Sequence, residues 1–184
     1  VRGAVGTPVK APRCGVPAMV EVTEDLGSGV TRATTYTRPY RLGREFSTLD
    51  HLTDGRVAIN VVTSYVESAA ENLGHSERMD KETRYDRADE FLDVCYQLWE
   101  ESWEDDAVEA VRETGRYSDP EKVHAIDHEG DHFSVPGPHG CEPSPQRTPV
   151  VYQAGSSDHG RSFAARNAEA VFASQPTEEG VREY

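Results

Sequence analysis

The sequence is short of basic residues. Lys and Arg number 19 against 33 Asp and Glu in 184 residues, which gives a formal net charge of −14. A phosphate backbone is bound mainly by Lys and Arg side chains that displace its counterions, so this composition disfavours a nucleic-acid partner. The same shortage of positive charge disfavours binding to an anionic membrane surface.

Long apolar runs are also missing. The longest, such as residues 57–59 and 150–152, have a few residues, whereas a bilayer span needs about 20. The first 13 residues contain no apolar segment of the ~7 to 15 residues that a secretory signal needs, and the sequence does not begin with Met. We therefore expect no transmembrane helix, a cytoplasmic location and a truncated chain.

Cysteine is sparse as well. Cys14, Cys95 and Cys141 are an odd number at unpatterned spacings, which predicts neither a disulfide framework nor a CxxC zinc site. Hydrophobic residues make up 36%, with a mean hydropathy of −0.68, which is lean for this length. Disorder and adaptation to high salt both explain such a composition. The regular apolar segments described next favour salt adaptation, in which ions screen the repulsion within an acidic surface.

The sequence does contain an alternation of helical and strand patterns. An irregular N-terminus (1–16) precedes the regular part, and a charged tail without a core face (175–184) ends it. The predicted helices are 17–26, 39–54, 84–99, 104–121 and 160–168, and the predicted strands are 29–36, 56–63, 149–155 and 171–172, with a hairpin at 123–135 and a Pro-rich loop at 136–148. This order predicts an α/β fold with parallel strands, either an open doubly wound sheet or part of a barrel.

Small polar residues follow the three longer predicted strands. They are Thr34 and Thr35, then Thr63 and Ser64, then Gly155, Ser156 and Ser157. Both architectures place the ligand site at the carboxyl edge of the strands. The sequence therefore predicts a site at this edge.

The segment Gly155-Ser156-Ser157 stands between a predicted strand and a predicted helix. Backbone N–H groups at a helix start, two hydroxyls and the positive end of the helix dipole suit a phosphate, although Ser157 as an ordinary N-cap explains the segment equally simply. A serine hydrolase is not indicated, because His159 stands where the nucleophile elbow G-x-S-x-G needs its second glycine.

Histidines recur at a spacing of four: His124, His128 and His132. On a helix their imidazoles would share one face and suit a metal, but Gly130 and the Val-rich flanks favour a hairpin, where they need not converge. We therefore predict that they bind no metal. The acidic residues around Trp103 are interpreted as a solvated helix face.

Five segments occur in order along the chain: REFSTLDHLTDGRV (44–57), NVVTS (60–64), RYDRADEF (84–91), DPEKVH (119–124) and SPQRTPVVYQAG (144–155). Together they resemble the flavin-dependent monooxygenases of the nitrilotriacetate and dibenzothiophene-sulfone monooxygenase type, within the bacterial-luciferase-like superfamily. The resemblance runs from about residue 17 to residue 173.

The resemblance implies a (β/α)8 TIM barrel, of which this chain (1–184) would form one partial domain with about four central β/α units. It implies an enzyme that uses O2 and reduced FMN, supplied by a separate NADH:FMN oxidoreductase, to oxygenate a small organic substrate, and it allows a homo-oligomer in the full-length form. Thr31 and Asn60 resemble residues near the flavin, and Tyr85 and Ser157 resemble contacts to its phosphate. The resemblance assigns no catalytic residue in this chain.

Two interpretations follow from the length. Relatives of this type are more than twice as long, and four strands cannot close an eight-stranded barrel. The chain is either the central portion of a working monooxygenase subunit or a truncated, non-catalytic remnant of one. A further departure is Lys81, which stands where the family usually has a His four residues before the tyrosine.

Overall fold

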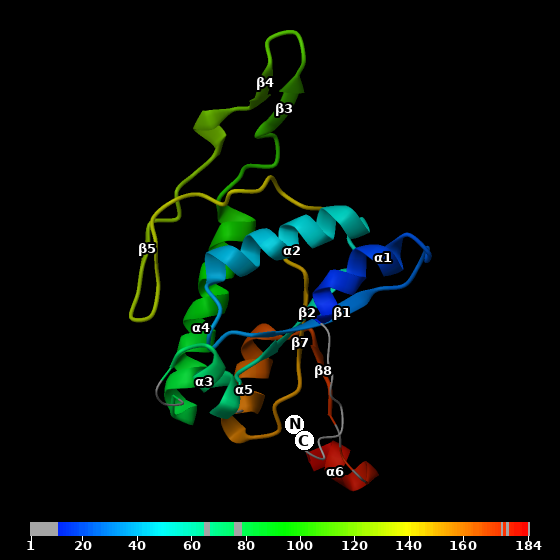
Figure 1. The fold of residues 1–184 in the computed structure, drawn as a ribbon, viewed down its shortest axis with the longest axis vertical. Coiled ribbons are helices and arrows are strands. Elements are labelled where there is room, and N and C mark those ends of the chain that lie inside the picture. The colour runs from blue at the N-terminus through cyan, green and yellow to red at the C-terminus, as the bar shows by residue number, and fades with distance from the viewer. Residues whose placement is uncertain (1–10, 65–66, 76–78, 174, 176, 184) are drawn as a thin grey trace.

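The computed structural model describes residues 11–64, 67–75, 79–173, 175 and 177–183. A four-stranded sheet lies at its centre, in the order β1 (Ser28–Ala33), β2 (Val57–Val62), β7 (Val150–Gln153) and β8 (Ala170–Val171). All three neighbouring pairs are parallel. This confirms the predicted α/β fold with a parallel sheet, and Figure 1 shows the sheet open, with no closed barrel among the described residues.

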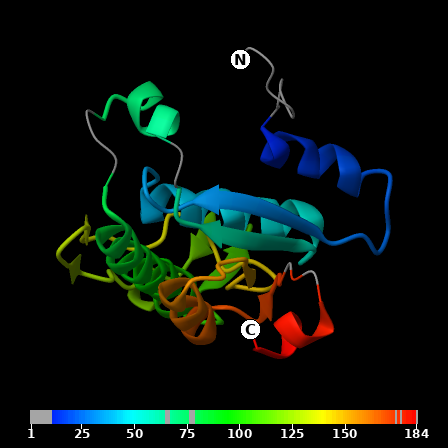
Figure 2. The ribbon, with the colours of Figure 1, turned by 90° about the horizontal axis from the view of Figure 1, so that it is seen from below.

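Helices cover one face of this sheet. They are α2 (Pro39–Thr53), α4 (Lys81–Tyr96) and α5 (Asp158–Asn167), and Figure 2 shows the green α4 and the orange α5 below the strands. Ile59, Val61 and Val151 alternate along the strands with less buried residues and belong to the same buried core as the helices' apolar side chains. The opposite face bears Asn60, which is partly buried, and Tyr152, which is exposed.

Local signals explain where the main helices begin and end. Pro39 opens α2, where its fixed φ suits the first turn, and Asp54 ends it in the left-handed region with φ 51°. Asp80 caps α4, because its side chain accepts the N–H of Thr83 at 3.0 Å. Phe91 and Leu92 are fully buried on the core side of α4.

The segment between α4 and β7 contains the main error of the sequence prediction. We predicted an acidic helix over 104–121, but β3 (Val108–Val111) and β4 (Arg116–Ser118) form an antiparallel hairpin there. Gly115 adopts φ 70° in the turn, which favours glycine, and the segment has no continuous apolar stripe to bury as a helix. The hairpin projects from the body of the molecule (Figure 1).

The same segment holds the predicted hairpin, formed by β5 (His128–Glu129) and β6 (Ser134–Val135), after a short 3₁₀ turn, η3 (Pro120–Lys122). Helix α4 itself continues as a π-helical turn, η2 (Gln97–Glu101).

The remaining elements are short. A 3₁₀ turn, η1 (Pro12–Gly15), precedes α1 (Val16–Val20), which ends well before the predicted Leu26. Helices α3 (Glu67–Asn72) and α6 (Glu178–Glu183) were not predicted; residues 1–10 of the predicted irregular start lie outside the described residues. Among the described residues, no helix combines the length and apolar character of a membrane span.

A buried carboxylate fixes the entry to β7. Asp50 of α2 is fully buried and accepts two hydrogen bonds from Gln146, one from its backbone N–H at 2.8 Å and one from its Nε2 at 2.5 Å. The same Nε2 also donates to the carbonyl of Val57 at 2.9 Å. Gln146 therefore ties α2, β2 and the loop before β7 together at the amino edge of the sheet.

Candidate functional site

The polar ends of the strands meet, as predicted. The N–H of Ser64, after β2, donates to Oγ1 of Thr35, after β1, at 3.2 Å. Two arginines of α4 secure these ends, because Arg84 donates to the carbonyl of Ser64 at 2.5 Å and Arg87 to that of Thr35 at 3.2 Å. Sequence reasoning missed both arginines, because nothing in the sequence of an acidic helix indicates that one of its arginines donates to a backbone carbonyl far away in the chain.

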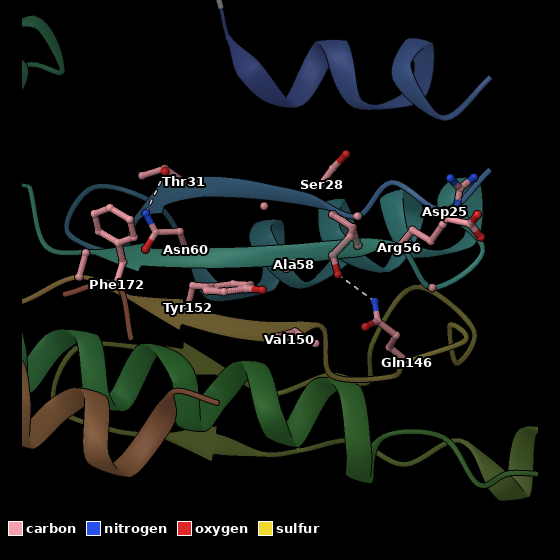
Figure 3. Close-up of a pocket in the computed structure, with 15 residues that line it drawn as sticks. Asp25, Ser28, Thr31, Arg56, Ala58, Asn60, Gln146, Val150, Tyr152 and Phe172 are labelled. Atoms are coloured by element: carbon pink, nitrogen blue, oxygen red, sulfur yellow. Dashed lines mark hydrogen bonds between the residues drawn. The ribbon is translucent and has the colours of Figure 1, made fainter. Parts of the chain in front are cut away.

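Thr31 and Asn60 lie side by side on the face of the sheet away from the helices. They are register partners on β1 and β2, and Asn60 Nδ2 donates to Thr31 Oγ1 at 3.0 Å (Figure 3). This bond leaves the Thr31 hydroxyl proton and the Asn60 carbonyl oxygen available to a ligand. Tyr152 of β7 is the next register partner of Asn60, so the three residues form one row across the sheet.

This row lines an open cleft of about 560 Å³. Ala58, Val150 and Phe172 supply apolar surface beside it, and Figure 3 shows the Phe172 ring near the Thr31–Asn60 end. The cleft thus pairs a small polar group with a largely apolar wall, which suits a flat, mostly apolar ligand with a few polar atoms.

A second polar group lies at the start of α5. Ser157 is the N-cap, and its Oγ accepts the N–H of Gly160 at 3.2 Å. The hydroxyl proton of Ser157 therefore remains available to an acceptor. Because the first N–H groups of a helix have no intrahelical partner, they and the helix dipole add positive potential at this point.

Two glycines allow the chain to come close at this helix start. A Cβ added at Gly160 would lie 3.0 Å from Cα of Gly155 and 3.0 Å from the hydroxyl oxygen of Tyr85. The Tyr85 hydroxyl of α4 therefore rests against the first turn of α5. We call Tyr85, Gly155, Ser157 and Gly160 the α5 cradle.

Charges around the α5 cradle include one carboxylate. Asp158 pairs with Arg161 at 2.6 Å, and its side chain is 91% exposed. The hydrogen bond from Arg161 lowers the pKa of Asp158, and the charges of Arg161, Lys81 and His159 lower it further. Asp158 is thus an ionised group directed to solvent and balanced by cations, Lys81 among them.

The α5 cradle fits a phosphate by the chemistry of its donors. It combines the Ser157 hydroxyl, the Tyr85 hydroxyl and a helix start, and Gly155 and Gly160 leave room for a close approach of the backbone. The structure brings Ser157 together with Tyr85, and Thr31 together with Asn60, as two separate groups. Strand β7 ends at Gln153, so Gly155 and the rest of the cradle lie beyond the carboxyl end of this strand.

The three histidines do not converge on one point. His128 Nε2 lies 3.2 Å from Glu90 of α4, whereas His124 Nε2 lies 2.9 Å from Glu104. Glu90 also accepts the backbone N–H of His132 at 2.9 Å. Within the described residues, no group of three His, Cys, Asp or Glu side chains is arranged to hold a metal ion.

The fold is that of an α/β protein with a parallel sheet, which carries polar side chains on its open face and a helix start beyond the carboxyl end of β7. The luciferase-like monooxygenase family matches residues 16–184. This chain belongs to that family, which confirms the resemblance inferred from its motifs.

Individual relatives support the same family assignment. A long-chain alkane monooxygenase of Geobacillus thermodenitrificans is 57% identical over 172 residues, covering 94% of this chain and 39% of that protein. Nitrilotriacetate monooxygenase component A of Aminobacter aminovorans is 46% identical over 160 residues, covering 87% of this chain and 35% of that protein. The chain therefore spans less than half the length of these relatives.

Solved structures support the same assignment. A crystal structure of long-chain alkane monooxygenase (LadA) superimposes with a TM-score of 0.95 at 54% identity, over 99% of this chain and 42% of that one. A riboflavin lyase (RcaE), crystallised with modified FMN and riboflavin, superimposes with a TM-score of 0.88 at 41% identity, over 96% of this chain and 40% of that one.

Proposed function

We propose that this chain is the FMN-binding portion of a flavin-dependent monooxygenase that oxygenates a small organic substrate. The observation that supports it most is the presence of two polar groups, the Thr31–Asn60 pair on the open face of the sheet and the α5 cradle beyond the carboxyl end of β7. FMN is elongated, with a flat ring at one end and a phosphate at the other, so in this proposal its ring lies on the open face and its phosphate reaches the cradle.

In this proposal the α5 cradle holds the phosphate. The Ser157 hydroxyl, the Tyr85 hydroxyl and the N–H groups at the start of α5 donate to its oxygens, and the helix dipole favours its negative charge. The Thr31 hydroxyl and the Asn60 carbonyl offer one donor and one acceptor to the polar edge of the ring. Ala58, Val150 and Phe172 supply apolar surface beside the ring.

Reduced FMN, when bound, supplies the electrons for the reaction with O2, in which one oxygen atom passes to the substrate and the other leaves as water. A separate NADH:FMN oxidoreductase would deliver the reduced flavin. The name of the 46% identical relative, component A, supports an enzyme of more than one component.

The remaining strands of a (β/α)8 barrel belong to this proposal as well. Strands β1 and β8 are the two edges of the sheet, and each offers unpaired backbone groups to a further strand. The apolar and aromatic side chains on the open face would then form part of the barrel interior.

The decisive experiment compares FMN with riboflavin, which lacks the phosphate. We would use a chimera in which residues 16–184 replace the matching segment of the Geobacillus alkane monooxygenase, so that the rest of the fold is present. Ser157→Ala removes one charge-assisted hydrogen bond, so FMN should bind about 10- to 100-fold more weakly while riboflavin binding is unchanged.

Thr177→Ala is the matched control, because Oγ1 of Thr177 accepts the N–H of Gly180 at 3.1 Å in the same kind of capping bond, and it should leave both affinities unchanged. Equal affinities of the unmodified chimera for FMN and riboflavin would contradict the phosphate site. An intact chimera that binds neither flavin would favour the non-catalytic remnant instead.

A further inference from the structure

Gln153 has an uncommon position for a polar residue. It is the last residue of β7, two positions after the buried Val151, and its side chain is 4% exposed. A buried amide is costly unless it is hydrogen-bonded. Its Oε1 accepts the backbone N–H of Gly155 at 2.5 Å. The side chain thus turns back onto the chain at the point where it leaves the sheet.

Gly155 packs closely against two partners. A Cβ at this position would lie 2.6 Å from Nε2 of Gln153 and 3.0 Å from Cα of Gly160. The first turn of α5 and the Gln153 amide therefore both lie against the face of Gly155 from which a side chain would project. Because Ser157 follows Gly155 by two residues, the position of Gly155 sets that of the Ser157 hydroxyl relative to Tyr85.

We infer that Gln153 is a positioning residue for the α5 cradle. It holds the turn at Gly155 so that the hydroxyls of Ser157 and Tyr85 and the start of α5 converge on one anion. This inference rests on the proposed function, since the anion is the FMN phosphate. In this inference Gln153 acts through preorganisation, because its Oε1 holds the backbone of the turn at Gly155.

The test replaces Gln153 with Met, which has nearly the same shape but no acceptor for the Gly155 N–H. FMN and riboflavin are titrated by flavin fluorescence into the full 184-residue chain and, in parallel, into the chimera. Loss of one hydrogen bond in the turn should weaken FMN binding about fivefold, with riboflavin unchanged. A purely structural role would weaken both flavins together.

Thr53→Val is the matched control. Its Oγ1 accepts the backbone N–H of Arg56 at 3.1 Å, so the variant also loses a side chain to backbone hydrogen bond in a turn, but at the opposite edge of the sheet. It should keep the preference for FMN over riboflavin. Gly155→Ala is the second variant, because its Cβ would displace the Gln153 amide directly, and it should show the same selective loss.

The outcomes separate the two proposals. If the unmodified protein prefers FMN and both Gln153→Met and Gly155→Ala retain that preference in full, the positioning role is refuted and the phosphate site stands. If the unmodified protein does not distinguish FMN from riboflavin, the phosphate site itself is wrong and the inference is overturned with it.

Discussion

Protonation of one buried histidine should limit the stability of this protein in acid. His139 lies in the Pro-rich loop, is 3% exposed, and places Nε2 2.9 Å from Oγ of Ser47 on α2. Its backbone is bonded too, since its N–H donates to Oγ of Ser102 at 2.6 Å and its carbonyl accepts from Nε1 of Trp103 at 2.9 Å. The imidazole is therefore fixed in the core, with little room to reach water.

Burial, followed by the positive charge of Arg44, lowers the pKa of His139 from 6.5 to about 4. As the pH falls, the unfolded chain takes up this proton first. The folded state therefore has its full stability above about pH 6.5 and loses stability as the pH falls from about 6.5 to about 4. Each pKa unit corresponds to about 1.4 kcal/mol, so the loss approaches about 3 kcal/mol.

Urea unfolding at about pH 7.5 and about pH 4.5 measures this loss. His139→Asn cannot take up a proton in this range, so its unfolding free energy should fall less between the two pH values than that of the unmodified chain. His51→Asn is the control, at an exposed position on the same helix as Ser47. Its unfolding free energy should fall between the two pH values as much as that of the unmodified chain. An equal fall in the unmodified chain and His139→Asn would refute the reasoning.

Three further predictions concern the whole chain, the histidines and the amino edge of the sheet. Because ions screen the self-repulsion of a chain of charge −14, the melting temperature should rise from low to molar salt, and a flat or falling trend would count against salt adaptation. Elemental analysis of the purified protein should find no stoichiometric zinc or iron; metal that is lost when His124, His128 and His132 are all replaced by Ala would show the prediction to be wrong. Gln146→Met should lower the unfolding free energy by about 1.5 to 3 kcal/mol, because buried Asp50 loses a charge-assisted hydrogen bond; denaturant titration measures this, and a change below about 0.5 kcal/mol would contradict it.

The sequence predicts correctly those helices and strands whose buried positions appear as a regular apolar pattern between clear start and stop residues. Pro39 at the start of α2 and Asp54-Gly55 at its end give clear signals, and the apolar run of β2 is typical of a buried parallel strand. The hairpin at 108–118 has no such pattern, because nine of its eleven residues are exposed and four are charged. Helices α3 and α6 are short and lack an apolar stripe, so periodicity does not reveal them.

The site could be predicted only in part, for a similar reason. Ser157 stands out because a strand, a small turn and a helix follow one another in the sequence. Tyr85 belongs to α4, and only the packing of α4 against α5 brings its hydroxyl to the same place, so the residues themselves gave no signal beyond the family resemblance. Gln153 was interpreted as an ordinary strand residue, because the bond that distinguishes it depends on how the chain turns after β7.

The most direct test of the central proposal is a crystal structure of the chimera with FMN bound. The account predicts that the phosphate oxygens lie about 2.6 to 3.2 Å from Oγ of Ser157, the Tyr85 hydroxyl and the first N–H groups of α5. It also predicts that the flavin ring lies against the Thr31–Asn60 pair. A phosphate bound elsewhere, with Ser157 only capping the N–H of Gly160, would contradict it.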